Sequence, residues 1–387
     1  MTEFEHDSTA DEMMGQVIGA ASAFDFAAVT AADVERSLAR EHKSWRDLGN
    51  LLSPAAEAYL EEMAQAAKGL TERHFGRNIS LYTPIYIANH CVNECAYCGY
   101  NRANHIRRAS LSFEEIEAEA EAIAATGLTD ILLLTGESRG LSGVEYIGEA
   151  VKILARRFKS VGLEVYPLKT EEYGRLHKLG ADFISVYQET YDPALYDAVH
   201  LAGPKKNYAW RFGANGRALA AGFRGAAFGA LLGLGDFRRD TLACGLHAGL
   251  VSSRFPQAEI SFSTPRIRPL PHTGKGLDGL VTIQKQEKIE SRVGEAELTQ
   301  VILALRLFMP WAGLSLSTRE RAWYRDNLIG LGVTRLSAGV KTGVGGRAGE
   351  DKGDEQFQKS DPRDVAEIKL AIEAKGYQPV FNDHVRL

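Results

Sequence analysis

Three cysteines lie close together in the stretch CVNECAYCGY. Cys91, Cys95 and Cys98 fall within eight residues of one another. A [4Fe–4S] cluster normally takes four thiolate ligands, so this stretch supplies all but one of them. The spacing therefore predicts a cluster whose fourth iron is open to a ligand from outside the protein.

The pattern CxxxCxxC, with Tyr97 before the last cysteine, is typical of radical S-adenosylmethionine (SAM) enzymes. In enzymes with this pattern, the amino and carboxylate groups of SAM bind the open iron. An electron from the cluster breaks the sulfonium C–S bond, and the resulting 5′-deoxyadenosyl radical abstracts hydrogen from an unactivated position. The cofactors implied by this resemblance are a [4Fe–4S] cluster and SAM.

Other roles for the cysteines have to be weighed. With His90 or His105 they could hold a structural zinc, although zinc sites are usually built from separated ligand pairs with C-x₂-C spacing. A disulfide framework fits less well, because the chain has only 4 cysteines in 387 residues. Cys244 lies in the apolar stretch DTLACGLHAGL, where it is most simply a buried small hydrophobic residue.

Length and composition suit one large α/β barrel with terminal additions, or two domains, since 45% of the 387 residues are hydrophobic. The 45 basic and 50 acidic residues give a net charge of −5, so nothing indicates nucleic acid or an anionic membrane as a partner. The N-terminal stretch lacks the basic and apolar regions of a signal peptide, and the longest apolar stretches fall short of the ~20 residues that span a bilayer. We therefore expect a cytoplasmic protein.

The chain divides into three predicted parts. Residues 1–76 carry apolar residues at helical spacing, with Thr30 or Ser53 as N-caps, and form an N-terminal helical extension. Residues 77–340 alternate strand-like and helix-like runs; one helix opens with the capping box Ser112–Glu115 and stops at Gly127. Residues 341–387 form a C-terminal extension: a Gly-rich loop over the barrel mouth, a helix capped at Ser360 and a short strand.

The middle part contains eight strand-like runs. They lie at residues 79–89, 130–136, 163–168, 182–187, 226–233, 259–264, 313–317 and 334–339. Eight strands in a βα series predict an α/β fold, a closed (β/α)₈ barrel of the TIM type.

Polar residues follow most of these strands, at the barrel end where active sites form. They include the three cysteines and Glu137, Gln188, Glu189, Arg266, Arg268, Arg319 and Ser337. Any one of them has an ordinary explanation as a solvated side chain or a helix cap, and either of the two arginines after the sixth strand could instead pair with Glu259 or a neighbouring helix. Their joint placement on one rim around a cluster loop predicts an active site.

Several motifs match one family. They are CVNECAYCGY, the TGE after the second strand, VYQETY (186–191), HLAGPKKNYAWR (200–211), PRIRP (265–269), LSLSTRE (314–320) and LSAGVKTGVGG (336–346). On these residues, from about residue 31 to the end, the chain resembles the tyrosine lyases of bacterial thiamine biosynthesis, the 2-iminoacetate synthase family. The resemblance implies SAM-dependent cleavage of the Cα–Cβ bond of L-tyrosine to p-cresol and 2-iminoacetate (dehydroglycine), with SAM converted to 5′-deoxyadenosine and methionine. It also implies thiazole synthase as the protein that uses 2-iminoacetate, and a flavodoxin or ferredoxin-type electron donor.

The same resemblance implies roles for individual residues. Cys91, Cys95 and Cys98 match the cluster ligands, and Arg319 and Ser337 match the pair expected at the substrate carboxylate, for which a guanidinium is a planar bidentate partner. The positions that contact SAM in the family and its relatives correspond to Tyr97, Glu137, Gln188, Glu189 and Arg211. One departure is the stretch 341–347, where family members often read KTxPGGY and this chain reads KTGVGGR.

Three alternatives remain open. A hydrogenase maturase also cleaves tyrosine but makes CO and cyanide, for which it needs a second cluster on a C-terminal cysteine motif; here no cysteine follows Cys244. A tryptophan-cleaving relative is a second alternative, because the sequence does not define the end of the pocket that takes the aromatic side chain. Outside enzymology, the alternative is a non-catalytic protein with a structural zinc or an electron-transfer cluster.

Overall fold

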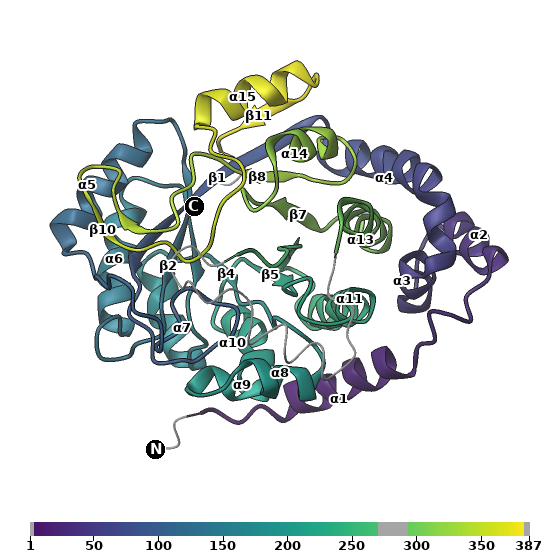
Figure 1. Cartoon of the computed structure of the whole chain (residues 1–387), viewed down its shortest axis with the longest axis horizontal. Coiled ribbons are helices and arrows are strands. Elements are labelled where there is room, and N and C mark those ends of the chain that lie inside the picture. The colour runs from purple at the N-terminus through teal and green to yellow at the C-terminus, as the bar shows by residue number, and fades with distance from the viewer. Residues whose placement is uncertain (1–3, 270–292, 383–387) are drawn as a thin grey trace.

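The strands of the computed structural model, which describes residues 4–269 and 293–382, close into a barrel. Its eight parallel strands are β1 (Asn78–Ala88), β2 (Asp130–Thr135), β3 (Ser160–Glu164), β4 (Phe183–Ser185), β5 (Gly225–Gly229), β6 (Glu259–Ser263), β7 (Gly313–Leu316) and β8 (Arg335–Ser337). The order runs from β1 to β8, and β8 pairs back with β1 through Tyr82 and Ser337. The predicted (β/α)₈ barrel is confirmed (Figure 1).

Helices between the strands cover the outside of the barrel (Figure 1). They are α5 (Phe113–Ala124), α6 (Val144–Ala155), α7 (Thr170–Leu179), α8 (Pro193–Val199), α9 (Tyr208–Phe212), α10 (Ala214–Ala220), α11 (Phe237–Arg254), α13 (Glu295–Phe308) and α14 (Ala322–Leu328). The predicted capping box is present at α5, where the Ser112 side chain accepts from the backbone of Glu115 and Glu115 accepts from that of Ser112. After α5 the chain turns at Gly127, whose φ of +89° favours glycine.

Some predicted boundaries differ from the structure. Strand β3 begins at Ser160 and ends at Glu164 instead of spanning 163–168, because SVGLE rather than the following apolar run pairs with β2. The fifth strand ends at Gly229, and beyond it only Ala230 and Leu232 form isolated bridges. These differences matter because they decide which side chains stand at the barrel mouth.

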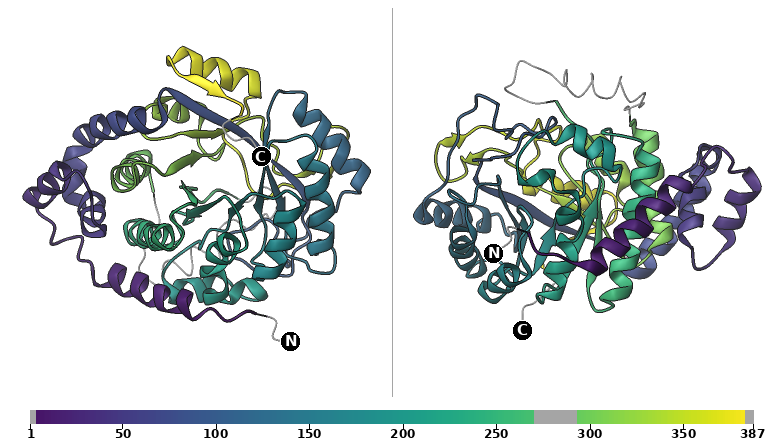
Figure 2. Two further views of the ribbon diagram at one scale, coloured as in Figure 1. Left: turned by 180° about the vertical axis from the view of Figure 1, so that it is seen from behind. Right: turned by 90° about the horizontal axis from the view of Figure 1, so that it is seen from below.

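The N-terminal part forms helices α1 (Ser8–Ala23), α2 (Ala31–Ala39), α3 (Trp45–Leu52) and α4 (Leu60–Phe75), with the short 3-10 turn η1 (Pro54–Tyr59) before α4. Helix α1 packs on α11, and α3 and α4 pack on α13, so this part lies along one flank of the barrel (Figures 1 and 2). Thr30 caps α2 in a capping box as predicted. Ser53 does not cap the following turn with its side chain, because its hydroxyl donates to the carbonyl of Asn50 instead.

The C-terminal part lies against the barrel mouth and then returns to the sheet. The Gly-rich stretch forms an antiparallel hairpin of β9 (Val344–Gly345) and β10 (Asp351–Gly353). Helix α15 (Val365–Ala374) is capped by Asp364, so the prediction of a cap at Ser360 is wrong; the Ser360 amide donates to the carbonyl of Thr318. Strand β11 (Gln378–Val380) then pairs in parallel with the start of β1.

The helices that the structure describes are short or polar relative to a membrane span. Within residues 4–269 and 293–382, none combines the length and hydrophobicity that crossing a bilayer requires.

Candidate active site

Two adjoining cavities open at the C-terminal ends of the strands. The first, which we call the inner cavity, reaches down into the barrel and is lined by residues that include Tyr82, Tyr86, Glu164, Tyr187, Arg319, Ser337 and Phe357. The second, the cysteine cavity, is lined by residues that include the three loop cysteines, Glu137, Glu164, Glu189, Lys205 and Arg211. Cys98, Glu164, Glu189 and Lys205 are among the residues that line both, so the two cavities share a wall.

The three loop cysteines face one cavity. Cys91 and Cys98 are partly exposed and Cys95 is buried. The side-chain amides of Asn93 and Gln356 each approach a sulfur, the Sγ of Cys91 and that of Cys98 respectively, both at 3.7 Å. Amide hydrogen bonds to sulfur are a usual feature of iron–sulfur sites, so this loop suits a cluster.

The geometry gives no support to a structural zinc. Among the described side chains, no group of three or more His, Cys, Asp or Glu residues is arranged to hold a metal ion, so neither His90 nor His105 completes a site with the cysteines. A four-iron cluster is larger than one ion, and its thiolate ligands stand further apart. Burial raises the pKa of Cys95 to about 12, and a coordinating metal would deprotonate such a thiol.

Glu189 is held firmly at the shared wall. Its Oε1 accepts from Lys205 Nζ at 2.7 Å and from Arg211 Nη2 at 3.0 Å. Burial opposes ionisation, but these two cations lower the pKa of Glu189 to about 2. Its φ of +72° makes it the one non-glycine residue with positive φ in the described parts of the chain, and such strain is typical of functional sites.

Glu137 and Tyr97 are fixed by other partners. Glu137 Oε2 accepts from Asn93 Nδ2 at 2.6 Å, which ties the loop after β2 to the cysteine loop. The Tyr97 hydroxyl lies 2.7 Å from His200 Nε2, while His200 Nδ1 lies 2.7 Å from the carbonyl of Tyr196. Because Nδ1 must then carry the proton, Tyr97 donates its hydroxyl proton to Nε2.

Gln188 lies beside the site rather than on its wall. It is 3% exposed, and it lines neither cavity, whereas its neighbours Tyr187 and Glu189 line both. The other residues predicted to bind the cluster, SAM or the substrate all line at least one of the two cavities.

Arg319 and Ser337 both line the inner cavity. The Arg319 guanidinium lies over the Phe357 ring, with 3.5 Å from its central carbon to the ring centre, and Nη1 donates to the carbonyl of Arg266. No described carboxylate forms an ion pair with it. Ser337 Oγ accepts from the Thr318 amide at 3.1 Å, so the ends of β7 and β8 are linked beside Arg319.

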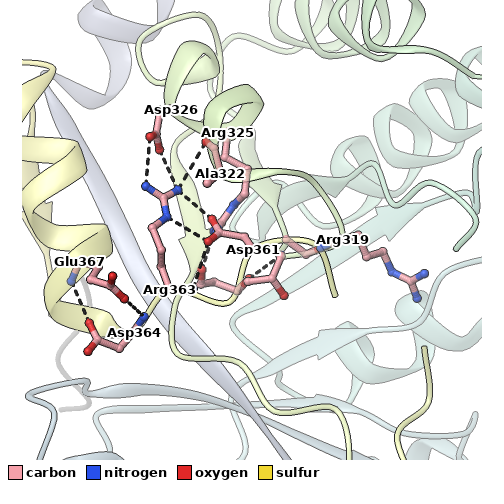
Figure 3. Close-up of polar contacts among 11 residues, drawn as sticks. Arg319, Ala322, Arg325, Asp326, Asp361, Arg363, Asp364 and Glu367 are labelled. Carbon is pink, nitrogen blue, oxygen red and sulfur yellow. Dashed lines mark hydrogen bonds and ion pairs between the residues drawn. The ribbon is translucent and has the colours of Figure 1, made fainter. Parts of the chain in front are cut away.

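A buried charged network supports these strand ends from behind (Figure 3). Arg325 forms an ion pair with Asp361 and donates to the carbonyl of Ser337, while Arg363 pairs with both Asp361 and Asp326. Figure 3 shows the Arg319 guanidinium pointing away from this network. The network therefore fixes the backbone around Arg319 without using its side chain, which faces the inner cavity.

The two arginines after β6 have different partners. Arg266 pairs with Glu320, and its Nη1 donates to the carbonyl of Val293, so its role is structural. Glu259 pairs instead with Arg224. Arg268 lines the inner cavity and contacts Ser360.

Several residues of the site were not identified from the sequence. Lys205 belongs to the motif HLAGPKKNYAWR, but the motif alone did not predict that Lys205 pairs with Glu189. Glu164 lies inside the predicted strand 163–168, whereas in the structure it is the last residue of β3. Gln356 and Phe357 approach from the C-terminal segment, and no local pattern signals that contact.

The chain is similar in sequence to known protein families. Residues 85–243 match the radical SAM superfamily, and residues 263–378 match the Biotin and Thiamin Synthesis associated domain. The 2-iminoacetate synthase of Salmonella typhimurium is 41% identical over 355 residues, which cover 92% of this chain and 91% of that protein. The chain belongs to the 2-iminoacetate synthase family. The predicted family is thereby confirmed, and with it the cofactors of radical SAM enzymes, a [4Fe–4S] cluster and SAM.

Two further relatives agree with this membership. The 2-iminoacetate synthase of Escherichia coli is 40% identical over 355 residues, again 92% of this chain and 91% of that protein. The solved structure of the FeFe-hydrogenase maturase HydG from Carboxydothermus hydrogenoformans superposes with a TM-score of 0.80 at 29% identity, and the match covers 97% of this chain and 83% of that chain. Members of the 2-iminoacetate synthase family and this maturase thus share the barrel and its C-terminal segment.

Proposed function

We propose that this chain is a radical SAM lyase that cleaves the Cα–Cβ bond of L-tyrosine to 2-iminoacetate and p-cresol, with SAM converted to 5′-deoxyadenosine and methionine. Family membership supports the reaction class. The observation that carries the proposal is the shared wall, which sets the cysteine loop beside the inner cavity, where Arg319 lies.

Cys91, Cys95 and Cys98 would hold the [4Fe–4S] cluster and leave one iron for the amino and carboxylate groups of SAM. When bound and reduced, the cluster with SAM supplies a radical that removes hydrogen from the substrate. The proposed SAM-binding residues are Tyr97, Glu137, Glu189 and Arg211, which line the cavities, together with Gln188, which lines neither cavity but precedes Glu189 in the chain. Glu189 is suited to this role because Lys205 and Arg211 keep it ionised, and a carboxylate accepts from ribose hydroxyl or amino groups.

Arg319 and Ser337 are proposed to bind the tyrosine carboxylate. The guanidinium has no carboxylate partner among the described residues, and Phe357 holds its plane. A planar guanidinium with free N–H groups binds a carboxylate with two parallel hydrogen bonds. With its carboxylate bound in this way, the aromatic ring of the substrate would occupy the depth of the cavity, where Tyr82, Leu132 and Tyr187 lie.

Exclusion of water is a further requirement, because 2-iminoacetate is an imine and hydrolyses readily. The segment from the β9–β10 hairpin to Phe357 lies over the site: Gln356 accepts from Gly99 through its carbonyl and contacts Tyr86 and Cys98 through its side chain. We propose that 2-iminoacetate passes to thiazole synthase for the thiazole of thiamine, and that a flavodoxin or ferredoxin-type protein donates the electron.

Two related reactions are the alternatives. Conversion of the two-carbon fragment to CO and cyanide needs a second cluster, and the 387 residues contain no cysteine after Cys244; Cys244 itself is buried on α11. Cleavage of tryptophan needs a cavity that takes an indole.

An anaerobic assay with reconstituted protein, SAM and dithionite separates these reactions. With tyrosine we expect p-cresol together with glyoxylate and ammonium from hydrolysis of the imine, about four irons per chain, and no CO in a haemoglobin trap or cyanide after derivatisation. Stoichiometric CO or cyanide with about eight irons, or turnover of tryptophan in preference to tyrosine, would contradict the proposal.

A further inference from the structure

Glu164 differs from the other acidic residues around the two cavities. It stands at the end of β3 and lines both cavities. Glu137 is bound by Asn93 and Glu189 by Lys205 and Arg211. The Glu164 carboxyl forms no hydrogen bond or ion pair with another residue in the described parts of the chain, although its backbone pairs with β2.

A carboxylate in such surroundings is costly to keep without a partner. Transfer of a charge into a poorly hydrated site is unfavourable unless it is paired, and burial raises the pKa of Glu164 to about 7. Hydrophobic side chains lie next to it in the sheet, since its register partner on β2 is Leu134. A carboxylate that lines a cavity without a protein partner is suited to bind a cationic group of a ligand.

Arg319 is in the complementary situation. It lines the same inner cavity, pairs with no described carboxylate, and exerts the strongest influence of any charged residue on Glu164. The two side chains are nevertheless not in contact as an ion pair. One cation and one anion therefore face a single cavity with space between them, which is the arrangement that a zwitterion requires.

We propose that Glu164 binds the α-ammonium group of the amino-acid substrate while Arg319 binds its carboxylate. The inference rests on the proposed function. The ammonium and carboxylate groups of an amino acid are attached to the same carbon, so the residues that bind them must face one cavity, as Arg319 and Glu164 do. Because Glu164 lines both cavities, the amino group that it holds lies where the substrate cavity meets the cysteine cavity.

The phenolic hydroxyl of tyrosine is the competing group for Glu164. In tyrosine this hydroxyl lies at the opposite end of the molecule from the carboxylate. A residue that bound it would be expected far from Arg319, and other hydroxyl partners, such as Tyr82 and Ser263, line the cavity. The amino group is therefore the better match.

Ligands that lack one group at a time test this assignment. We would measure binding of labelled tyrosine to the reconstituted, unreduced protein with SAM present, and competition by phenylalanine, by 3-(4-hydroxyphenyl)propanoate, which lacks the amino group, and by tyramine, which lacks the carboxylate. The variants are Glu164→Gln, Arg319→Gln and the control Glu145→Gln, whose side chain is 84% exposed on α6. Binding of SAM serves as the test that each variant is intact.

For Glu164→Gln we expect binding of tyrosine, phenylalanine and tyramine to weaken about 10- to 100-fold, as for loss of one hydrogen bond to a charged group. Binding of 3-(4-hydroxyphenyl)propanoate should stay within about twofold of wild type. Arg319→Gln should weaken the three carboxylate ligands and spare tyramine. Glu145→Gln should change none of them. Glu164→Asp, which keeps the charge, should retain the preference for ligands with an amino group.

Equal losses for tyrosine and its deaminated analogue, with phenylalanine unaffected, would place Glu164 at the phenol and overturn the assignment. Unchanged tyrosine binding in Glu164→Gln would also overturn it. Failure of the proposed function has a different signature, because wild-type protein would then form no p-cresol whatever the variant does.

Discussion

The guanidinium of Arg319 lies over the ring of Phe357, with 3.5 Å between its central carbon and the ring centre. Arg319 follows β7, whereas Phe357 belongs to the C-terminal segment that passes over the barrel mouth. The segment therefore does more than cover the cavity: it supplies one face of the proposed substrate anchor. This contact makes the orientation of Arg319 depend on the correct docking of the C-terminal segment.

Replacement of Phe357 by leucine should weaken tyrosine binding. A cation–π contact contributes about 0.5–2 kcal/mol, so we expect the KM for tyrosine to rise about 2- to 30-fold with little change in SAM binding. The control is Phe255→Leu, which removes a ring beneath Arg254 at the other end of the barrel, 5.3 Å from its guanidinium carbon. Parallel loss of SAM and tyrosine binding would show that Phe357 supports the fold of the site and not the anchor.

Replacement of Arg319 by alanine should lower catalytic efficiency toward tyrosine by roughly 30- to several-thousand-fold. Truncation of one partner of a buried charge pair costs about 2–5 kcal/mol, and each 1.36 kcal/mol is tenfold in rate. Its neighbour Arg321, which is 69% exposed and pairs with Glu295, offers a control that should keep near-normal activity. Equal losses of affinity for SAM and for tyrosine would give Arg319 a structural or SAM-binding role.

Each loop cysteine should be needed for the cluster, and the fourth cysteine should not. We expect alanine at position 91, 95 or 98 to abolish formation of 5′-deoxyadenosine and to lower bound iron and labile sulfide. Cys244→Ala should retain them, because Cys244 is buried on α11, 3% exposed, and lines neither cavity. Loss of the cluster in Cys244→Ala with retention in Cys91→Ala would reverse this assignment.

Stability should depend on pH through Glu164. Burial raises its pKa from the usual 4.5 to about 7. A carboxyl whose pKa is higher in the folded state stabilises the fold below its unfolded pKa, and this contribution is lost as pH rises from 4.5 through 7. At 1.36 kcal/mol per pKa unit, the cost of ionisation is at most about 3 kcal/mol above pH 7.

Glu164→Gln removes that cost. In the absence of substrate, the variant should therefore unfold at a higher temperature than wild type at pH 8, and at nearly the same temperature at pH 5. Thermal unfolding at both values checks this, with Glu145→Gln as the exposed control. An equal or lower midpoint for Glu164→Gln at pH 8 would mean that a protein group stabilises the charged carboxylate.

The sequence was sufficient for the barrel and for most of its rim. Alternating apolar runs predicted eight strands, and polar residues after those strands led to Glu137, Glu189, Arg319 and Ser337, because the ends of parallel strands meet on one face. The cysteine loop was recognisable from residue types and spacing alone. These features are local, or follow from one rule of barrel architecture.

The rest depends on register and on contacts distant in sequence. The stretch from Ser160 to Leu168 is apolar over most of its length, and periodicity does not decide which part pairs with β2; the prediction chose the later part and so missed Glu164 at the strand end. The contacts of Gln356 with Cys98 and of Phe357 with Arg319 arise only when the C-terminal segment docks on the mouth. Gln188 was predicted at the site from its motif, although the neighbouring residues, and not Gln188, line the cavities.

A single-turnover reaction tests the central proposal most directly. Reconstituted protein with one equivalent of SAM, excess tyrosine and dithionite would be quenched without oxygen, and 5′-deoxyadenosine and p-cresol measured in the same sample. The proposed reaction predicts both products in equal amounts in wild type and neither in Cys91→Ala. Formation of 5′-deoxyadenosine without p-cresol, in protein that carries a full cluster and binds tyrosine, would contradict it.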